Sequence, residues 1–166
     1  MLTPYNQVKE FHQAFDPVDH QGAKVFTAQQ ALFRTMFKGE ELVEFLYAAA
    51  NNDQQLFTNL VSEFQTSIDE AKVKIEKKHQ KVTDPLVEQA DALIDLLYFT
   101  YGSFVQMGVD PSELFSIVHQ ANMGKLFPDG QPHYHPKTGK VMKPDNWEKD
   151  FAPEEKIREA IKKQLK

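Results

Sequence analysis

The fold is decided by RTMFKGEELVEFLY, residues 34–47, and by EQADALIDLLYFTY, residues 88–101. Between Ala92 and Phe99 almost every residue of the second stretch is apolar. A helix that is apolar on all sides is normally buried. We therefore expect this helix to lie in the interior, with the first stretch as its partner.

Each stretch also carries an acidic stripe. Asp95 lies inside the apolar run of the second stretch, with Asp91 one turn earlier and Glu88 before it, and the first stretch carries Glu40, Glu41 and Glu44. At 100° per residue, acids at this spacing fall on one side of a helix.

A buried carboxylate is costly unless its charge is compensated. Arg34 and Lys38 are the bases near the acids in these two helices, too few to pair with the whole set. Two acid-lined helices facing each other would offer oxygen ligands to a hard divalent cation, foremost Mg²⁺, with Mn²⁺ as an alternative. The competing interpretation is a non-catalytic helical binding or assembly module whose acids are an ordinary solvated face.

Composition narrows the class of protein. The chain has 166 residues, 41% hydrophobic and 26% charged, which is typical of one globular domain, and we expect a single domain over residues 1–166. It has no cysteine, which excludes disulfides, thiolate zinc sites and cysteine nucleophiles. A net charge of −5 argues against nucleic acid as a partner. Without a signal peptide or an apolar run of membrane-spanning length, we expect a cytoplasmic protein that binds no membrane.

Helix-start patterns recur along the chain. Thr3-Pro4, Thr27 with Gln30, Thr83-Asp84-Pro85 and Asp110-Pro111 each place a capping residue before a helix. They predict helices over residues 4–15, 28–50, 85–107 and from 111 onward, with another polar helix from 53 to about 80. Gly39 interrupts the helix 28–50 just before its acids, which suggests close packing or a local distortion there.

The C-terminal part of the chain differs from the rest. Residues 126–150 are rich in proline, glycine and turn dipeptides and have no apolar period, so we expect an irregular flap. A charged helix over residues 153–165 follows. The fold class is therefore all-α, with five to six helices and one C-terminal flap. No phosphate-binding glycine loop, GxSxG elbow or Glu-x-x-His pair occurs.

Taken together, EExxE, the later DLLYFTYG, VHQANMGK and GKVMKPDNW resemble the MazG-like all-α nucleoside triphosphate pyrophosphohydrolases. The similarity extends from about Val8 to Trp147. It is greatest to the subgroup with bacterial dUTP-hydrolysing and phosphoribosyl-ATP pyrophosphatase-like members.

The resemblance implies a site. The glutamates of EExxE, here Glu40, Glu41 and Glu44, would coordinate Mg²⁺. The family's second motif is ExxD with its aspartate before the LLY run, which corresponds to Asp95. Ala92 then replaces the glutamate of that motif; Asp91 could supply the missing carboxylate, with Glu88 in reserve. Residues that would bind substrate phosphates are Asn122, Lys125, Lys140 and Lys143.

The resemblance further implies Mg²⁺-dependent cleavage of a nucleoside triphosphate to the monophosphate and pyrophosphate. Metal ions would orient and activate a water, and Glu40 or Glu41 would accept its proton. We also expect a homodimer or a dimer of dimers, because the long helices carry more apolar surface than one small bundle buries. Base and sugar preference cannot be read from the chain.

Overall fold

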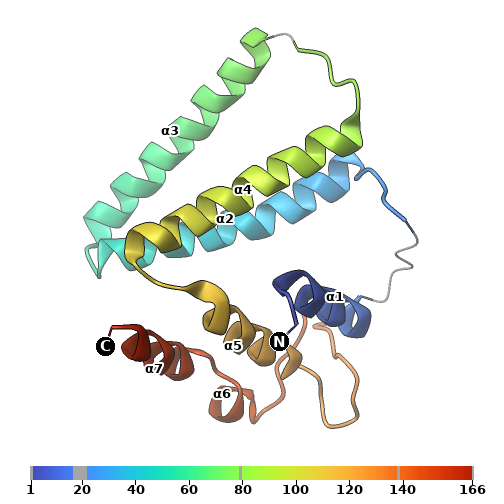
Figure 1. The fold of residues 1–166 in the computed structure, drawn as a ribbon, viewed down its shortest axis with the longest axis vertical. Coiled ribbons are helices and arrows are strands. Elements are labelled where there is room, and N and C mark those ends of the chain that lie inside the picture. The colour runs from blue at the N-terminus through green and yellow to red at the C-terminus, as the bar shows by residue number, and fades with distance from the viewer. Residues whose placement is uncertain (1, 17–21, 79, 138, 166) are drawn as a thin grey trace. The chain divides into compact units, whose positions relative to one another are not determined.

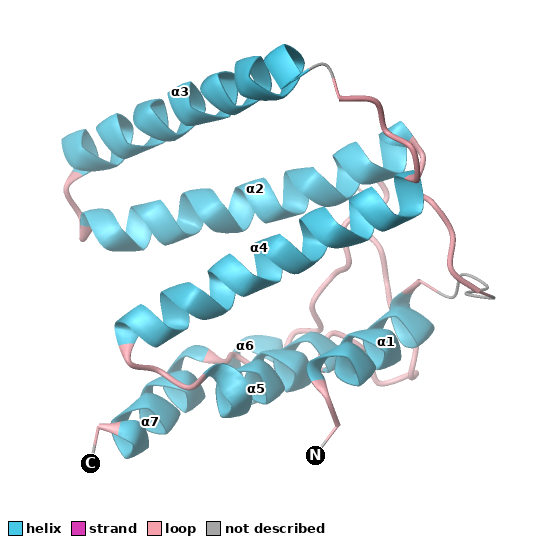
Figure 2. Cartoon of the chain, turned by 45° about the horizontal axis from the view of Figure 1, so that its top comes forward, coloured by secondary structure: helices cyan, strands magenta, loops and turns pink. Residues whose placement is uncertain are grey.

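The computed structural model describes residues 2–16, 22–78, 80–137 and 139–165. Within these ranges the chain forms only helices and loops, apart from an isolated antiparallel bridge between Tyr134 and Val141 (Figures 1 and 2). The helices are α1 (Pro4–Phe15), α2 (Ala28–Ala50), α3 (Gln54–Lys78), α4 (Pro85–Met107), α5 (Pro111–Met123), α6 (Trp147–Asp150) and α7 (Glu154–Gln164).

The predicted all-α fold is confirmed. Six of these helices lie where the sequence places them. The additional helix, α6, is a single turn inside the irregular segment 126–150.

The helix starts follow from local hydrogen bonds that the sequence encodes. Thr27 Oγ1 accepts from the backbone N–H of Gln30 at 3.3 Å, and Gln30 Oε1 accepts from the N–H of Thr27 at 3.0 Å. At α1, Thr3 accepts from the N–H of Asn6, and Pro4 occupies the first turn. These bonds satisfy backbone donors that have no partner inside the helix.

A tight turn joins α2 to α3. Asn51 and Asn52 have φ values of 46° and 71°, in the left-handed region that asparagine adopts more readily than most residues. The Tyr47 and Phe57 rings meet edge to face across the turn, with centroids 5.2 Å apart. Asp53 then caps α3 by accepting from the N–H of Leu56 at 2.9 Å.

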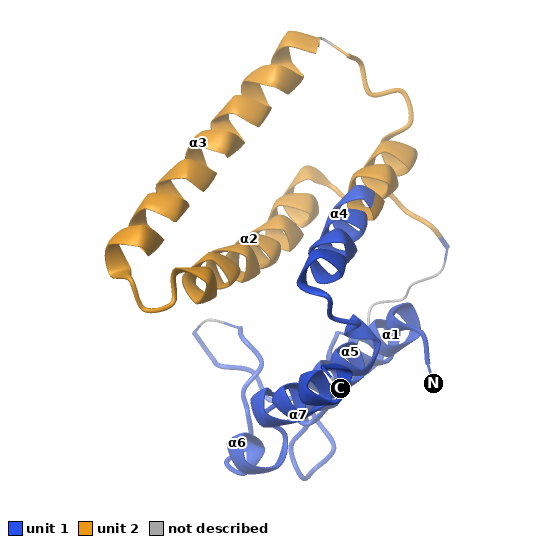
Figure 3. Ribbon diagram, turned by 60° about the vertical axis from the view of Figure 1, so that its left-hand side comes forward, with its two compact units in different colours: residues 1–22, 95–166 blue, residues 23–94 orange. Residues whose placement is uncertain are grey.

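The chain forms two compact units (Figure 3). One comprises residues 1–22 and 95–166, so that it holds α1, α5, α6, α7 and the flap. The other comprises residues 23–94 and holds α2, α3 and the first part of α4. A single domain over residues 1–166 stays a prediction.

The unit with α1 and α5 contains a small apolar core. Its buried side chains include Phe15, Leu114, Ala121, Trp147 and Ala160. Gln7 on α1 is also buried and donates to Ser116 Oγ on α5 at 3.0 Å, which satisfies a polar group that would otherwise be costly to bury. At the other end of α5, Gln164 of α7 exchanges two hydrogen bonds with the backbone of Asp110, at 2.8 and 3.0 Å.

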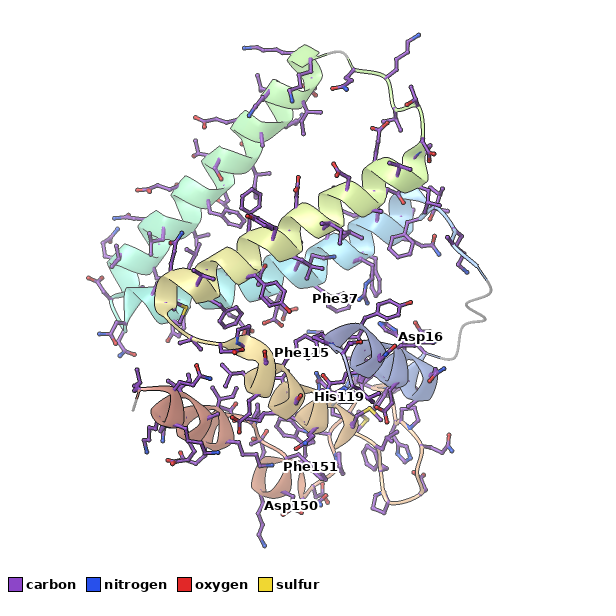
Figure 4. The ribbon with its side chains drawn as sticks, viewed as in Figure 1. Asp16, Phe37, Phe115, His119, Asp150 and Phe151 are labelled. Atoms are coloured by element: carbon purple, nitrogen blue, oxygen red, sulfur yellow. The ribbon has the colours of Figure 1, made fainter. Side chains whose placement is uncertain are left out.

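Helix α4 has no buried residue in the single chain, so the expectation that it lies in the interior of one chain is wrong. Leu97, Phe99 and Val105 are 53%, 70% and 79% exposed. Apolar side chains of α2 are exposed as well, among them Phe33, Met36 and Phe37; Figure 4 labels Phe37. The physical reason is that an apolar helix needs neighbours on every side, and the described part of one chain does not supply them.

No single helix of the described residues has both the length and the hydropathy of a membrane span. Helices α4 and α5 meet such a criterion only as a pair, and the chain bends by 117° between them.

Two glycines test the packing directly. A Cβ on Gly124 would overlap the ring of Phe151, which Figure 4 labels, whereas a Cβ on Gly39 would meet nothing within 4 Å. The close packing suggested for Gly39 is therefore absent from the single chain. We expect Gly124→Ala to lower the free energy of unfolding by about 1–3 kcal/mol through overpacking.

Gly39→Ala is the matched control. It should raise the free energy of unfolding by up to about 1 kcal/mol, because alanine favours a helix more than glycine does. Urea denaturation of both variants measures the difference, and equal stabilities would contradict the packing seen at Gly124.

Candidate functional site

The acids of α2 are accessible in the structure. Glu40, Glu41 and Glu44 are exposed, and no described residue forms an ion pair with Glu41 or Glu44. The nearby Lys38 donates to the carbonyl oxygen of Arg34 at 3.1 Å instead. Burial lowers the pKa of Lys38, and the positive charge of Arg34 lowers it further. The carboxylates of Glu41 and Glu44 are therefore left available to a cation.

The acids of α4 are divided between two roles. Asp91 and Asp95 are exposed one turn apart, and neither pairs with a described residue. Glu88 instead accepts a hydrogen bond from the backbone N–H of Thr83 at 2.9 Å, and Asp84 accepts from that of Leu86 at 3.1 Å. Glu88 thus has one oxygen engaged in starting the helix, whereas both oxygens of Asp91 are open.

One spacing was missed in the sequence analysis. Glu88 and Asp91 are themselves three residues apart, as ExxD requires, and both lie with Glu40, Glu41 and Glu44 in the unit 23–94, whereas Asp95 lies in the other unit. This spacing is visible in the sequence, but it was overlooked because the aspartate of the motif was assigned to Asp95, the residue before the LLY run. Asp91 belongs to the pair with Asp95 and to the pair with Glu88, but not to the reserve pair of Glu88 with Asp95.

The starts of α2 and α4 are fastened to each other. Gln89 accepts from the N–H of Phe26 at 2.9 Å and donates to the carbonyl oxygen of Phe26 at 3.1 Å. Phe26 comes just before α2, and Asp91 follows Gln89 by two residues. Glu40, by contrast, lies about 18 Å along the axis of α2 from Ala28, at 1.5 Å per residue.

The acids of α2 and α4 do not form a metal-binding cluster within the described part of the chain. Among the described residues no group of three or more His, Asp or Glu side chains is close enough to hold a metal ion. Their chemistry nevertheless suits a hard cation, since they are exposed oxygen ligands and four of them, Glu41, Glu44, Asp91 and Asp95, are unpaired.

The phosphate-binding residues expected from the sequence fall near the end of α5 and in the flap. Asn122 Oδ1 accepts from Lys125 Nζ at 2.7 Å, so the structure brings this pair together. Lys143 lies over the ring of Trp147 and 3.1 Å from Glu148. Lys140 is in the hairpin of the flap, where its carbonyl oxygen accepts from the N–H of His135 at 2.9 Å.

Comparison with known proteins agrees with this description. The family model of phosphoribosyl-ATP pyrophosphohydrolase matches residues 8–122. A crystal structure of a candidate NTP pyrophosphohydrolase from Exiguobacterium sp. 255-15 is 37% identical in sequence and superposes with a TM-score of 0.87, covering 99% of this chain and 96% of that one. No curated protein matches the chain.

The all-α fold and its matches define the class of protein as a nucleotide pyrophosphohydrolase, as the MazG-like resemblance indicated. More specifically, the chain belongs to the phosphoribosyl-ATP pyrophosphohydrolase family.

Proposed function

We propose that this protein is a Mg²⁺-dependent nucleoside triphosphate pyrophosphohydrolase that cleaves the anhydride between the α- and β-phosphates. The main support is a set of exposed, unpaired carboxylates, Glu41, Glu44 and Asp91, in a chain of this family. A cytoplasmic role in removing unwanted nucleotides suits such an activity.

Glu41, Glu44 and Asp91 would hold the metal, with Asp95 or Glu88 adding a ligand from α4. Bound Mg²⁺ supplies a water of lowered pKa and neutralises phosphate charge. Glu40 or Glu41 accepts the proton as the water oxygen attacks phosphorus. The bond between that phosphorus and the bridging oxygen then breaks, leaving a nucleoside monophosphate and pyrophosphate.

Lysine side chains and an asparagine amide would bind the phosphates of the substrate and offset their negative charge. A triphosphate brings several negative charges, which carboxylates alone would repel. Lys125, Lys140 and Lys143 oppose that charge, and Asn122 offers an amide that can donate to phosphate oxygen. Donors already in place need little rearrangement when charge develops on the leaving pyrophosphate.

The proposal is tested by measuring pyrophosphate release from a panel of ribo- and deoxyribonucleoside triphosphates, with phosphoribosyl-ATP included because it names the family. We expect at least one triphosphate to be cleaved with Mg²⁺ or Mn²⁺, and activity to disappear with EDTA and return with excess metal. Release that is unaffected by EDTA would overturn the metal requirement. No metal-dependent pyrophosphate release from any member of the panel, phosphoribosyl-ATP included, would overturn the proposed activity, whereas cleavage of phosphoribosyl-ATP alone would restrict the substrate to that modified triphosphate.

We further propose that the working form is a homodimer or a dimer of dimers. The exposed apolar residues of α2 and α4 exceed what an isolated soluble chain normally leaves uncovered. A second copy would bury them, since oligomers of one chain are usually symmetric and use the same surface twice.

Light scattering should therefore give two or four times 19.1 kDa at micromolar concentration. Phe99→Glu places a charge on the exposed face of α4 and should shift the protein towards smaller species. Tyr5→Glu, at a residue of α1 that is 77% exposed, is the control and should leave the mass unchanged. A wild-type mass of 19.1 kDa would contradict the proposal.

A further inference from the structure

Two aromatic side chains fasten the flap to helix ends. The indole N–H of Trp147 donates to the carbonyl oxygen of Ala121 in the last turn of α5 at 2.8 Å. The hydroxyl of Tyr134 donates to the carbonyl oxygen of Phe15, the last residue of α1. The carbonyl oxygens in the last turn of a helix accept no hydrogen bond from an N–H group of that helix. Each aromatic group therefore satisfies a backbone oxygen and fixes a part of the flap in place.

Trp147 has a second contact that Tyr134 lacks. The Nζ atom of Lys143 lies 3.7 Å from the centroid of the indole ring, well within the range of a cation–π interaction. Glu148 accepts from the same Nζ at 3.1 Å. The indole is only 5% exposed, whereas the side chain of Lys143 remains 47% exposed. The indole ring thus contacts one side of the ammonium group, and the exposed side remains accessible to a ligand.

The anchor lies next to Lys125, another basic residue of this unit. Ala121, which accepts the indole hydrogen bond, directly precedes Asn122, whose side chain binds Lys125. A single hydrogen bond of Trp147 therefore attaches the segment that carries Lys143 to the helix turn that carries Asn122. Both lysines then lie on segments that this hydrogen bond joins.

We propose that Trp147 is a positioning residue for the substrate, holding the ammonium of Lys143 ready for the polyphosphate. The inference rests on the proposed function, in which Lys143 binds phosphate. A free lysine side chain loses much rotational freedom when it binds. The indole face and Glu148 reduce this loss by ordering the chain beforehand. The more highly charged polyphosphate then displaces Glu148.

The protein contains a built-in probe, because Trp147 is its one tryptophan. Titration with inorganic tripolyphosphate at constant ionic strength should displace Glu148 from the Lys143 ammonium while the ammonium stays on the indole face. This change of charge beside the ring should alter the fluorescence of Trp147 in a saturable manner. Lys143→Met should abolish the change, and Lys137→Met, at an exposed lysine of the same flap, should retain it. An unchanged wild-type signal, or an unchanged response of Lys143→Met, would overturn the inference without reference to turnover.

Kinetics then separate positioning from mere stability. Trp147→Phe keeps an aromatic ring but removes the N–H and should raise KM for the triphosphate about three- to tenfold, with kcat little changed. Lys143→Met should have a similar effect, and the double variant should be no worse than either single one. If the fold-changes in KM of Trp147→Phe and Lys143→Met multiply in the double variant, the two residues act independently and the proposed coupling is wrong.

Two further variants complete the design. Tyr134→Phe removes the other anchor. Its fold-change in KM should multiply with that of Lys143→Met in the double variant, since no contact between Tyr134 and Lys143 is seen. If Trp147→Phe does not fold, Glu148→Gln replaces it, at an exposed position that the fold does not depend on, and should show a smaller coupling to Lys143→Met. A normal KM for Lys143→Met would refute the phosphate role in the proposed function. A raised KM for Lys143→Met with a normal one for Trp147→Phe would refute only the positioning role.

Discussion

Replacing Asp91 by asparagine should reduce Mg²⁺-dependent turnover by more than about 100-fold. Changes in groups that only orient metal ligands cost 10- to 100-fold, and Asp91 is proposed as a ligand itself. The substitution preserves volume and removes one charge from a stripe shared with Glu88 and Asp95. The free energy of unfolding should therefore stay constant or rise by about 0.3 kcal/mol.

Steady-state rates at several Mg²⁺ concentrations measure this effect, with Asp69→Asn as the control at an exposed aspartate of α3. Two companion variants identify the second α4 ligand. If Asp95→Asn lowers turnover as much as Asp91→Asn does and Glu88→Gln does not, the second ligand is Asp95, as expected from the LLY run. If Glu88→Gln lowers turnover as much and Asp95→Asn does not, the second ligand is Glu88. Glutamine can still accept from the N–H of Thr83, so Glu88→Gln leaves the helix start intact. Near-normal activity of Asp91→Asn would refute every pair that contains Asp91 and would leave Glu88 with Asp95, the reserve assignment.

Glu44→Gln should have an effect of the same size on α2. Removing a ligand charge should raise the Mg²⁺ concentration needed for half-maximal activity and lower turnover by about 100-fold or more at low Mg²⁺. Glu40→Gln should behave differently if Glu40 is the base, lowering kcat at saturating Mg²⁺ while leaving the metal requirement unchanged.

The control for this series is Glu63→Gln, at an exposed glutamate of α3. Its kinetics should match those of the wild type. Glu44→Gln with an unaltered Mg²⁺ requirement would exclude Glu44 as a ligand, whatever its effect on kcat.

The helices were predictable because their determinants are local. Thr27 with Gln30 and Asp110 before Pro111 use side chains a few residues from the backbone groups that they cap. Such bonds depend on neighbours in sequence and are encoded wherever the residues occur. The spacing of the acids along each helix is local in the same sense, which is why both acidic stripes were found from the sequence, although the ExxD pair of Glu88 and Asp91 within one of them was overlooked.

Distant contacts were not predictable. The indole of Trp147 reaches Ala121 across 26 positions, and the hydroxyl of Tyr134 reaches Phe15 across 119. Nothing in an irregular segment rich in proline and glycine indicates which of its aromatic groups will meet a helix end. The same holds for Phe26 and Gln89, whose paired hydrogen bonds set the starts of α2 and α4 together.

The sequence by itself determined the all-α class and the limits of six helices, because helix periodicity and capping are properties of neighbouring residues. It also singled out the residues that we propose to bind a cation or a phosphate. Only the tertiary structure decided that the α4 face is exposed in the single chain, that Glu88 has one oxygen engaged, and that Lys143 rests on Trp147. These features depend on which surfaces meet after the chain has folded, and the free energy of such contacts comes from groups far apart in sequence.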